Sequence, residues 1–204
     1  KKYVVTTVGR VIFNDIFPPK VPYQNYTFDK GKLNDIAMTC FHLVGQHNTA
    51  IILDRMKELG FSFATRAGAT FSIADVIMPQ AKEEILDRAE KEVAQIIESY
   101  MQGGITDTER YNRVVDKWKI TTERVTNALM EDLKYDRDGF NSIYMMFISG
   151  ARGGKDQIKQ LGGMRGLMAK PTRSTNDIRQ VIETPIKSNF REGLSVVEYF
   201  LSTH

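Results

Sequence analysis

The residues best suited to chemistry lie in a glycine-rich, basic stretch, residues 149–169 (SGARGGKDQIKQLGGMRGLMA). Glycine lets backbone N–H groups approach an anion closely, and the side chain of Arg152 or Lys155 could neutralise a phosphate. The stretch has neither the G-x-x-x-x-G-K-[ST] pattern of a P-loop nor a G-x-G-x-x-G pattern after a strand. Phosphate contact is therefore one hypothesis, and a tightly turned packing loop is the simpler alternative.

No pattern in the sequence predicts a metal site or a nucleophile. His42, His47 and His204 form no HExxH motif, and we expect them to be ordinary surface or core histidines. Cys40, the single cysteine, lies in an apolar helical stripe with no visible base beside it, so we expect it in the core. We therefore predict no catalytic residue, no metal ligand and no cofactor for this stretch of chain.

An antiparallel helical hairpin is the clearest element that the sequence predicts. One apolar stripe with spacings of three and four runs from Leu86 to Tyr100, and a second runs from Tyr111 to Leu129. Pro79 suits the first position of the first helix, Gly103-Gly104 breaks it, and residues 106–109 (TDTE) have the form of a capping box. Charged residues surround the two stripes, so we expect the hairpin to project from a body.

The regions on either side of the hairpin have weaker patterns. We expect an extended segment at residues 3–13, a proline-rich loop to Asp29, a helix over 29–46, and a second helix capped by Asn48-Thr49 and ended by Gly60. Residues 61–75 predict a strand or loop, and residues 194–201 a short helix. The predicted fold is mainly α with irregular and short β segments (α+β): a projecting antiparallel helical hairpin on a mixed body, with a glycine-rich loop region at the C-terminal end.

Composition narrows the class of protein only broadly. The 204 residues are 42% hydrophobic and 26% charged, which is typical of a globular chain. No run of about 18 apolar residues predicts a membrane span, and a net charge of +3 does not by itself indicate nucleic-acid binding. The sequence opens Lys1-Lys2-Tyr3 without an initiator Met and closes directly after an apolar run, so we interpret it as a piece of a longer polypeptide.

Several short strings resemble the β′ subunit of bacterial DNA-directed RNA polymerase, in order along essentially the whole chain. The specific strings are TVGR at 7–10, SGARG at 149–153, QL at 160–161, GMRGLMA at 163–169, PI at 185–186, NFREGL at 189–194, YF at 199–200 and STH at 202–204. The resemblance implies part of a nucleotidyltransferase of transcription, lying around the secondary channel through which NTPs reach the active centre. It implies a pore region at 1–76, the rim-helix hairpin of the funnel at 77–135, and an F-loop region leading into the bridge helix at 136–204.

The resemblance also implies roles for individual residues. Arg152 would face the phosphates of incoming NTPs, and the F-loop core would support the bridge helix and trigger loop. The F-loop residues are Met164, Arg165, Gly166, Leu167 and Met168, and residues 172–180 form a longer turn than is usual. The regulator-docking residues, which would receive coiled-coil factors of the Gre and DksA kind, are Glu109, Arg110, Tyr111, Asn112, Arg113 and Asp116.

The resemblance implies partners as well. These are the β, α, ω and σ subunits, NTPs, and DNA and RNA in the whole complex, in the cytoplasm and associated with the nucleoid, with no membrane. The whole enzyme would bind Mg²⁺ and Zn²⁺ in other segments, so we expect no catalysis by this stretch alone. Two alternatives stay open: a stand-alone helical-hairpin adaptor that binds other proteins, and a phosphate-binding enzyme built on SGARGG.

Overall fold

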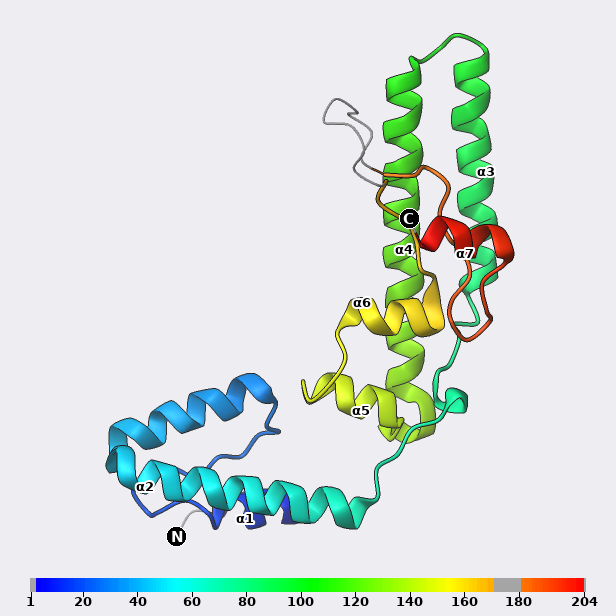
Figure 1. The fold of residues 1–204 in the computed structure, drawn as a ribbon. Helices are drawn as coiled ribbons and strands as arrows, with labels where there is room; N and C mark the ends of the chain where they lie inside the picture. The colour runs from blue at the N-terminus through cyan, green and yellow to red at the C-terminus, as the bar shows by residue number, and fades with distance from the viewer. Residues whose placement is uncertain (1–2, 171–180, 204) are drawn as a thin grey trace. The chain divides into compact units, whose positions relative to one another are not determined.

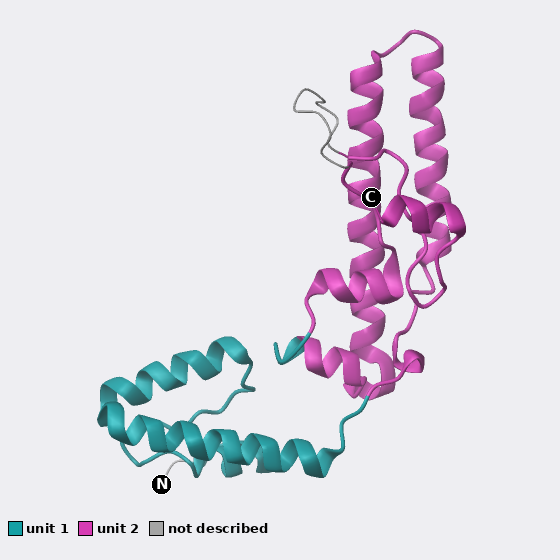
Figure 2. Cartoon of the chain, viewed as in Figure 1, with its two compact units in different colours: residues 1–70, 148–152 teal, residues 71–147, 153–204 magenta. Residues whose placement is uncertain are grey.

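The computed structural model describes residues 3–170 and 181–203. The chain forms two compact units, Lys1–Thr70 with Ile148–Arg152, and Phe71–Phe147 with Gly153–His204 (Figure 2). The prediction of a mainly α fold is confirmed. The prediction of short β segments is wrong for the described residues. Those residues hold only two isolated antiparallel bridges, Gly166–Ile186 and Ala169–Val181, and no strand (Figure 1). Whether residues 1–76, 77–135 and 136–204 act as three functional regions stays a prediction.

The first unit contains α1 (Val8–Asn14) and the long α2 (Lys30–Ala67). The expected extended segment at residues 3–13 is therefore wrong from Val8 onward, because α1 begins after Thr7, which is itself extended. Asp29 caps α2 by accepting a hydrogen bond from the backbone N–H of Lys32 at 2.8 Å. The helix breaks at Gly45, whose φ of 79° and ψ of 170° are accessible to glycine and strained for other residues.

Two boundaries within α2 differ from the sequence prediction. Asn48 and Thr49 do not cap a new helix, because their side chains donate to the carbonyl oxygens four residues earlier, at 2.9 and 2.8 Å. Gly60 does not end the helix, which continues to Ala67 and stops at Gly68 in the left-handed conformation. An interior glycine costs about 1 kcal/mol relative to alanine, and α2 continues through the exposed Gly60 despite that cost.

Cys40 lies in the core of the first unit, as predicted. Its side chain is 1% exposed and packs in a cluster with Val21, Ile36 and Ile52. Burial raises the pKa of its thiol, which keeps the sulfur protonated and inert at neutral pH. The cluster joins the two arms of α2 and the loop before them into one small body.

The second unit is built on the predicted hairpin, α3 (Lys82–Met101) and α4 (Asp107–Tyr135), which run antiparallel (Figure 1). Thr106 caps α4, since its hydroxyl accepts a hydrogen bond from the N–H of Glu109 at 3.3 Å. The first helix begins three residues after the predicted Pro79. Trp118, 4% exposed, packs between the helices as expected, in a cluster with Ala89, Val114, Val125 and Met164.

Short elements complete the second unit, several of them at the C-terminal end of α4. They are the 3-10 turns η1 (Ile73–Asp75) and η2 (Asp136–Gly139), α5 (Ser142–Ile148), α6 (Lys155–Ile158), the π-helical turn η3 (Lys159–Gly163), and α7 (Val196–Ser202). Leu129 and Leu133 of α4 and Ile158 of α6 form a second buried cluster there. The prediction of a strand or loop at 61–75 is correct only for the loop at 68–72, because α2 extends to Ala67 and η1 begins at Ile73. The predicted C-terminal helix is confirmed as α7.

None of the helices in the part of the chain that the structure describes is both long and apolar enough to cross a membrane.

Candidate functional site

The glycine-rich loop packs its backbone directly against its neighbours in the second unit. A Cβ at Gly162 would overlap the carbonyl oxygen of Ile77, and one at Gly163 would lie 3.5 Å from both Val125 and Leu129 of α4. Gly166 has a φ of 87° and lies against Thr122. In this part of the stretch the glycines therefore serve close packing, which was the simpler of the two interpretations of the pattern.

The five predicted F-loop residues follow this turn. Met164 is fully buried, and its sulfur lies 3.6 Å from the hydroxyl of Thr122 on α4. Leu167 packs on the same cluster. The backbone of Gly166 exchanges two hydrogen bonds with Ile186, at 2.9 and 2.8 Å, and Met168 accepts one from the N–H of Ile182 at 2.9 Å.

Arg165 occupies the most polar position of this loop. Its guanidinium lies 5.4 Å from the centre of the Phe190 ring, and its Nε is buried without a hydrogen-bond partner among the described residues. Its backbone N–H donates to the carbonyl oxygen of Ser188 at 3.1 Å. The backbone N–H of Arg165 is thus paired, while its buried Nε makes no hydrogen bond with a described residue.

Asn189 holds the two most specific strings of the sequence together, although sequence analysis gave it no role. Its fully buried side-chain amide donates to the carbonyl oxygens of Gly162 and Gly163, at 3.2 and 3.1 Å, and its oxygen accepts from the N–H of Glu192 at 2.8 Å. Phe190 N–H also donates to Gln160 at 3.0 Å. The strings GMRGLMA and NFREGL therefore form one structural unit, which the spacing in the sequence does not reveal.

Lys82 and Glu192 form an ion pair that the sequence analysis also missed. Lys82 Nζ lies 2.7 Å from each carboxylate oxygen of Glu192, and the lysine side chain is only 8% exposed. A cation in the first turn of a helix opposes the helix dipole. That unfavourable position was the available signal that Lys82 needs an acidic partner.

Glu198 organises the start of α7. Its carboxylate accepts hydrogen bonds from the hydroxyls of Ser188 and Ser195, both at 2.9 Å, and from the N–H of Ser195 at 3.0 Å. Partial burial acts to raise the pKa of Glu198, but these hydrogen bonds outweigh it and lower the pKa from 4.5 to about 2. The residue is therefore ionised at neutral pH and ties α7 to the segment before Asn189.

The predicted docking residues at the start of α4 divide into two groups. Glu109, Asn112, Arg113 and Asp116 are exposed, and Glu109 pairs with Arg113 at 2.6 Å. Arg110 and Tyr111 face the chain itself: Arg110 pairs with Glu183 at 2.8 Å, and the Tyr111 hydroxyl donates to the carbonyl oxygen of Val181 at 2.8 Å. The exposed four are free to meet a partner, and the other two are engaged internally.

Arg152 belongs to the first unit. Its side chain is exposed and makes no hydrogen bond or ion pair with a described residue. The backbone just before it is anchored, because the carbonyl oxygen of Ser149 accepts from Lys30 N–H at 3.1 Å and a Cβ on Gly150 would lie 3.0 Å from the Lys30 side chain. The guanidinium of Arg152 is therefore available to an anion.

The longer turn predicted at 172–180 lies outside the described residues.

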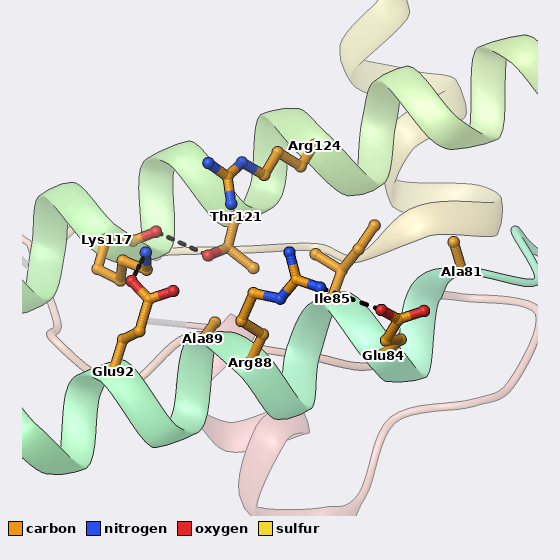
Figure 3. A pocket seen from close by; sticks show the side chains of 9 residues that line it. All are labelled: Ala81, Glu84, Ile85, Arg88, Ala89, Glu92, Lys117, Thr121 and Arg124. Atoms are coloured by element: carbon orange, nitrogen blue, oxygen red, sulfur yellow. Dashed lines mark hydrogen bonds and ion pairs between the residues drawn. The ribbon is translucent and has the colours of Figure 1, made fainter.

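A cavity of about 370 Å³ opens between α3 and α4 on the flank of the hairpin (Figure 3). Its lining includes Arg88, Lys117 and Arg124, with Glu84 and Glu92 as carboxylates. Arg88 pairs with Glu84 at 3.1 Å, and Lys117 pairs with Glu92. Burial, and then the charges of Arg124 and Arg88, lower the pKa of Lys117. The pocket is therefore locally positive, with one cation more than its carboxylates balance.

Residues 3–170 and 181–203 contain no group of three His, Cys, Asp or Glu side chains that could hold a metal ion. The donor sets of Mg²⁺ or Zn²⁺ do not fit the residues described, so we assign no metal-dependent step to them.

Comparison with known proteins defines the class first. Residues 1–76 match the family "RNA polymerase Rpb1, domain 3", and residues 105–191 match "RNA polymerase Rpb1, domain 4". The second match covers all of α4 together with the glycine-rich loop and Asn189.

The relatives narrow the class to one subunit. The chain is 49% identical over 199 residues to "DNA-directed RNA polymerase subunit beta'" of Bacteroides fragilis, and 48% identical over 204 residues to that of Parabacteroides distasonis. It is 49% identical over 203 residues to the subunit of Borrelia hermsii. These alignments cover 98 to 100% of this chain and 14% of each relative. The chain belongs to the family of bacterial RNA polymerase β′ subunits and spans about a seventh of its relatives' length.

Proposed function

We propose that this chain is the part of a DNA-directed RNA polymerase β′ subunit that surrounds the NTP-conducting secondary channel. In this role it guides substrate, supports the bridge helix and trigger loop, and docks secondary-channel regulators. The observation that carries the proposal is the identity of about half the residues along the whole chain to β′ subunits. That identity includes the loop as well as the hairpin, and so favours the polymerase over a stand-alone adaptor.

The geometry of the loop supports the bracing role. Met164 is buried against α4, and the side-chain amide of Asn189 binds the turn that precedes Met164. A loop held in this way is preorganised, so it can hold the elements that pack on it in a defined position. We assign the support of the bridge helix and trigger loop to Met164–Met168.

Arg152 is the proposed contact for NTP phosphates. A guanidinium binds phosphate oxygens in a bidentate manner and stays charged at any physiological pH. The exposure of its side chain and its lack of an ion pair with a described residue leave the charge available.

The partners of the proposed role are the β, α, ω and σ subunits, NTPs, DNA and RNA, and factors of the Gre and DksA kind, in the cytoplasm. Nucleotide addition is the activity of the whole enzyme, whose Mg²⁺ and Zn²⁺ would be bound by other segments. We therefore expect no template-dependent incorporation of nucleotides by this chain alone.

Factor binding to a polymerase assembled with the full-length subunit tests the docking role. A double charge reversal, Glu109→Lys with Asp116→Lys, should abolish saturable binding of a Gre- or DksA-type coiled-coil protein, because both side chains are exposed on one stretch of α4. The matched control, Glu123→Lys with Glu131→Lys, makes the same change in charge at exposed positions farther along α4 and should bind normally. Equal binding by the two variants would refute docking at the start of α4.

A further inference from the structure

The predicted docking residues in the first turns of α4 fall on two sides of the helix, one exposed and one covered. Glu109, Asn112, Arg113 and Asp116 face solvent. Arg110 and Tyr111 are covered, with a 14% exposed arginine side chain and a tyrosine that is 9% exposed. A docking partner can reach the first group directly, whereas it can reach the second only by displacing part of the protein.

The single hydroxyl of Tyr111 binds both backbone polar groups of one residue, Val181. Its hydroxyl donates to the carbonyl oxygen of Val181 at 2.8 Å and accepts from the N–H of Val181 at 3.3 Å. A phenolic oxygen can donate and accept at once, so one side chain satisfies the donor and the acceptor of one residue. Val181 also forms an antiparallel bridge with Ala169, directly after the predicted F-loop core.

Arg110 binds the same segment at Glu183, two residues after Val181. Its guanidinium pairs with Glu183 at 2.8 Å and with Asp107 at 2.9 Å, and it lies 5.5 Å from the centre of the Tyr100 ring on α3. The hydrogen bonds to Glu183 and then Asp107 raise the pKa of Arg110, so the guanidinium stays charged. The contact therefore joins both helices near the tip of the hairpin to Glu183.

The segment 181–186 lies between α4 and the loop core. On one side, Val181 and Glu183 bind Tyr111 and Arg110. On the other side, Ile182 N–H donates to Met168 at 2.9 Å, and Ile186 exchanges two hydrogen bonds with Gly166. A shift of this segment along α4 would break both sets of bonds, so the contacts from α4 fix the register of the loop.

We propose that Arg110 and Tyr111 are positioning residues for nucleotide addition rather than contacts of a docked regulator. They hold the segment 181–186, and through it the loop Met164–Met168, while the exposed residues of the same helix bind the partner. This inference rests on the proposed function. It divides the predicted docking residues into two that position the loop and four that bind the regulator.

The test uses RNA polymerase assembled with the full-length subunit. Tyr111→Phe keeps the ring but removes both hydrogen bonds to Val181, and Glu183→Gln weakens the Arg110 contact without touching α4. Tyr135→Phe is the control, because Tyr135 is 67% exposed. For each variant we would measure the maximal rate and KM of single-nucleotide addition per active centre, and the Kd of a Gre-type factor.

We expect Tyr111→Phe and Glu183→Gln each to lower the maximal rate about fivefold, the ratio that corresponds to the loss of about 1 kcal/mol of hydrogen bonding. KM and the Kd of the factor should not change, and Tyr135→Phe should match the wild type. Because the rate is counted per assembled active centre, a merely structural role in folding would leave it unchanged. An unchanged rate in either variant, or weaker factor binding by Tyr111→Phe, would overturn the inference.

The two proposals fail in different ways. A wild-type polymerase that does not bind the factor refutes the docking part of the proposed function. The rate measurement is independent of that binding, and it alone then decides whether Arg110 and Tyr111 position the loop.

Discussion

Lys82 and Glu192 lie 110 residues apart in the sequence, and Lys82 Nζ is 2.7 Å from both carboxylate oxygens of Glu192. This ion pair joins the first turn of α3 to the segment that carries Asn189. The same segment binds the Gly162-Gly163 turn, so the base of the hairpin and the glycine-rich loop are held by one connected set of contacts.

Lys82→Ala should destabilise the chain by about 2–4 kcal/mol, because it removes one partner of a pair whose lysine is buried. Glu192 is 33% exposed, so water solvates part of the abandoned carboxylate and keeps the cost below that of a fully buried pair. Lys91→Ala, an exposed lysine of the same helix, should change stability by less than about 0.5 kcal/mol. Unfolding by denaturant, followed by circular dichroism, measures both, and equal midpoints would contradict this role of Lys82.

Asn189→Asp should destabilise the chain by at least about 2 kcal/mol. The change replaces a buried donor with a carboxylate oxygen that faces the carbonyl oxygens of Gly162 and Gly163, so both acceptors lose their partner beside a buried charge. Asn112→Asp is the same substitution at an exposed position of α4 and should be nearly neutral. Hydrogen exchange of residues 160–168 gives a local readout, and unchanged protection there would rule out the Asn189 contacts as the support of this turn.

The hairpin was predictable from the sequence because its apolar positions recur every three or four residues and its ends carry capping and glycine signals. Trp118 and Cys40 were placed in cores for the same reason. The period reports which face of a helix is buried, and that information is local.

Local composition gave the wrong prediction at two elements of the first unit. Val8–Asn14 is rich in β-branched and aromatic residues but forms α1, and α2 continues through Gly60. The contacts of Asn189, Lys82 and Tyr111 join segments that are 26 to 110 residues apart, and no local spacing encodes them. The sequence therefore identified the loop and the hairpin as separate features, and the structure shows how they are connected.

Gly162→Ala should destabilise the second unit by about 1–3 kcal/mol, because a Cβ there overlaps the carbonyl oxygen of Ile77 and backbone cannot move aside as a flexible side chain can. Gly154→Ala is the matched control from the same stretch, since its Cβ would meet nothing within 4 Å and its φ is −99°. Thermal unfolding of the two variants compares them directly. A tolerated alanine at position 162 would show that the turn can move away from Ile77.

Glu198→Gln should destabilise α7 at neutral pH by about 1–2 kcal/mol, because the hydrogen bonds from Ser188 and Ser195 lose their charged acceptor. The folded-state pKa, about 2, lies below the ordinary 4.5, so the carboxylate contributes its full stability above pH 4.5. That contribution is lost as the pH falls from 4.5 towards 2. The difference in stability between wild type and Glu198→Gln should therefore be constant from pH 7 to 5 and shrink below pH 4.5. Glu123→Gln, at an exposed position of α4, should show no such pH dependence, and a difference for Glu198→Gln that stays constant down to pH 3 would contradict the lowered pKa.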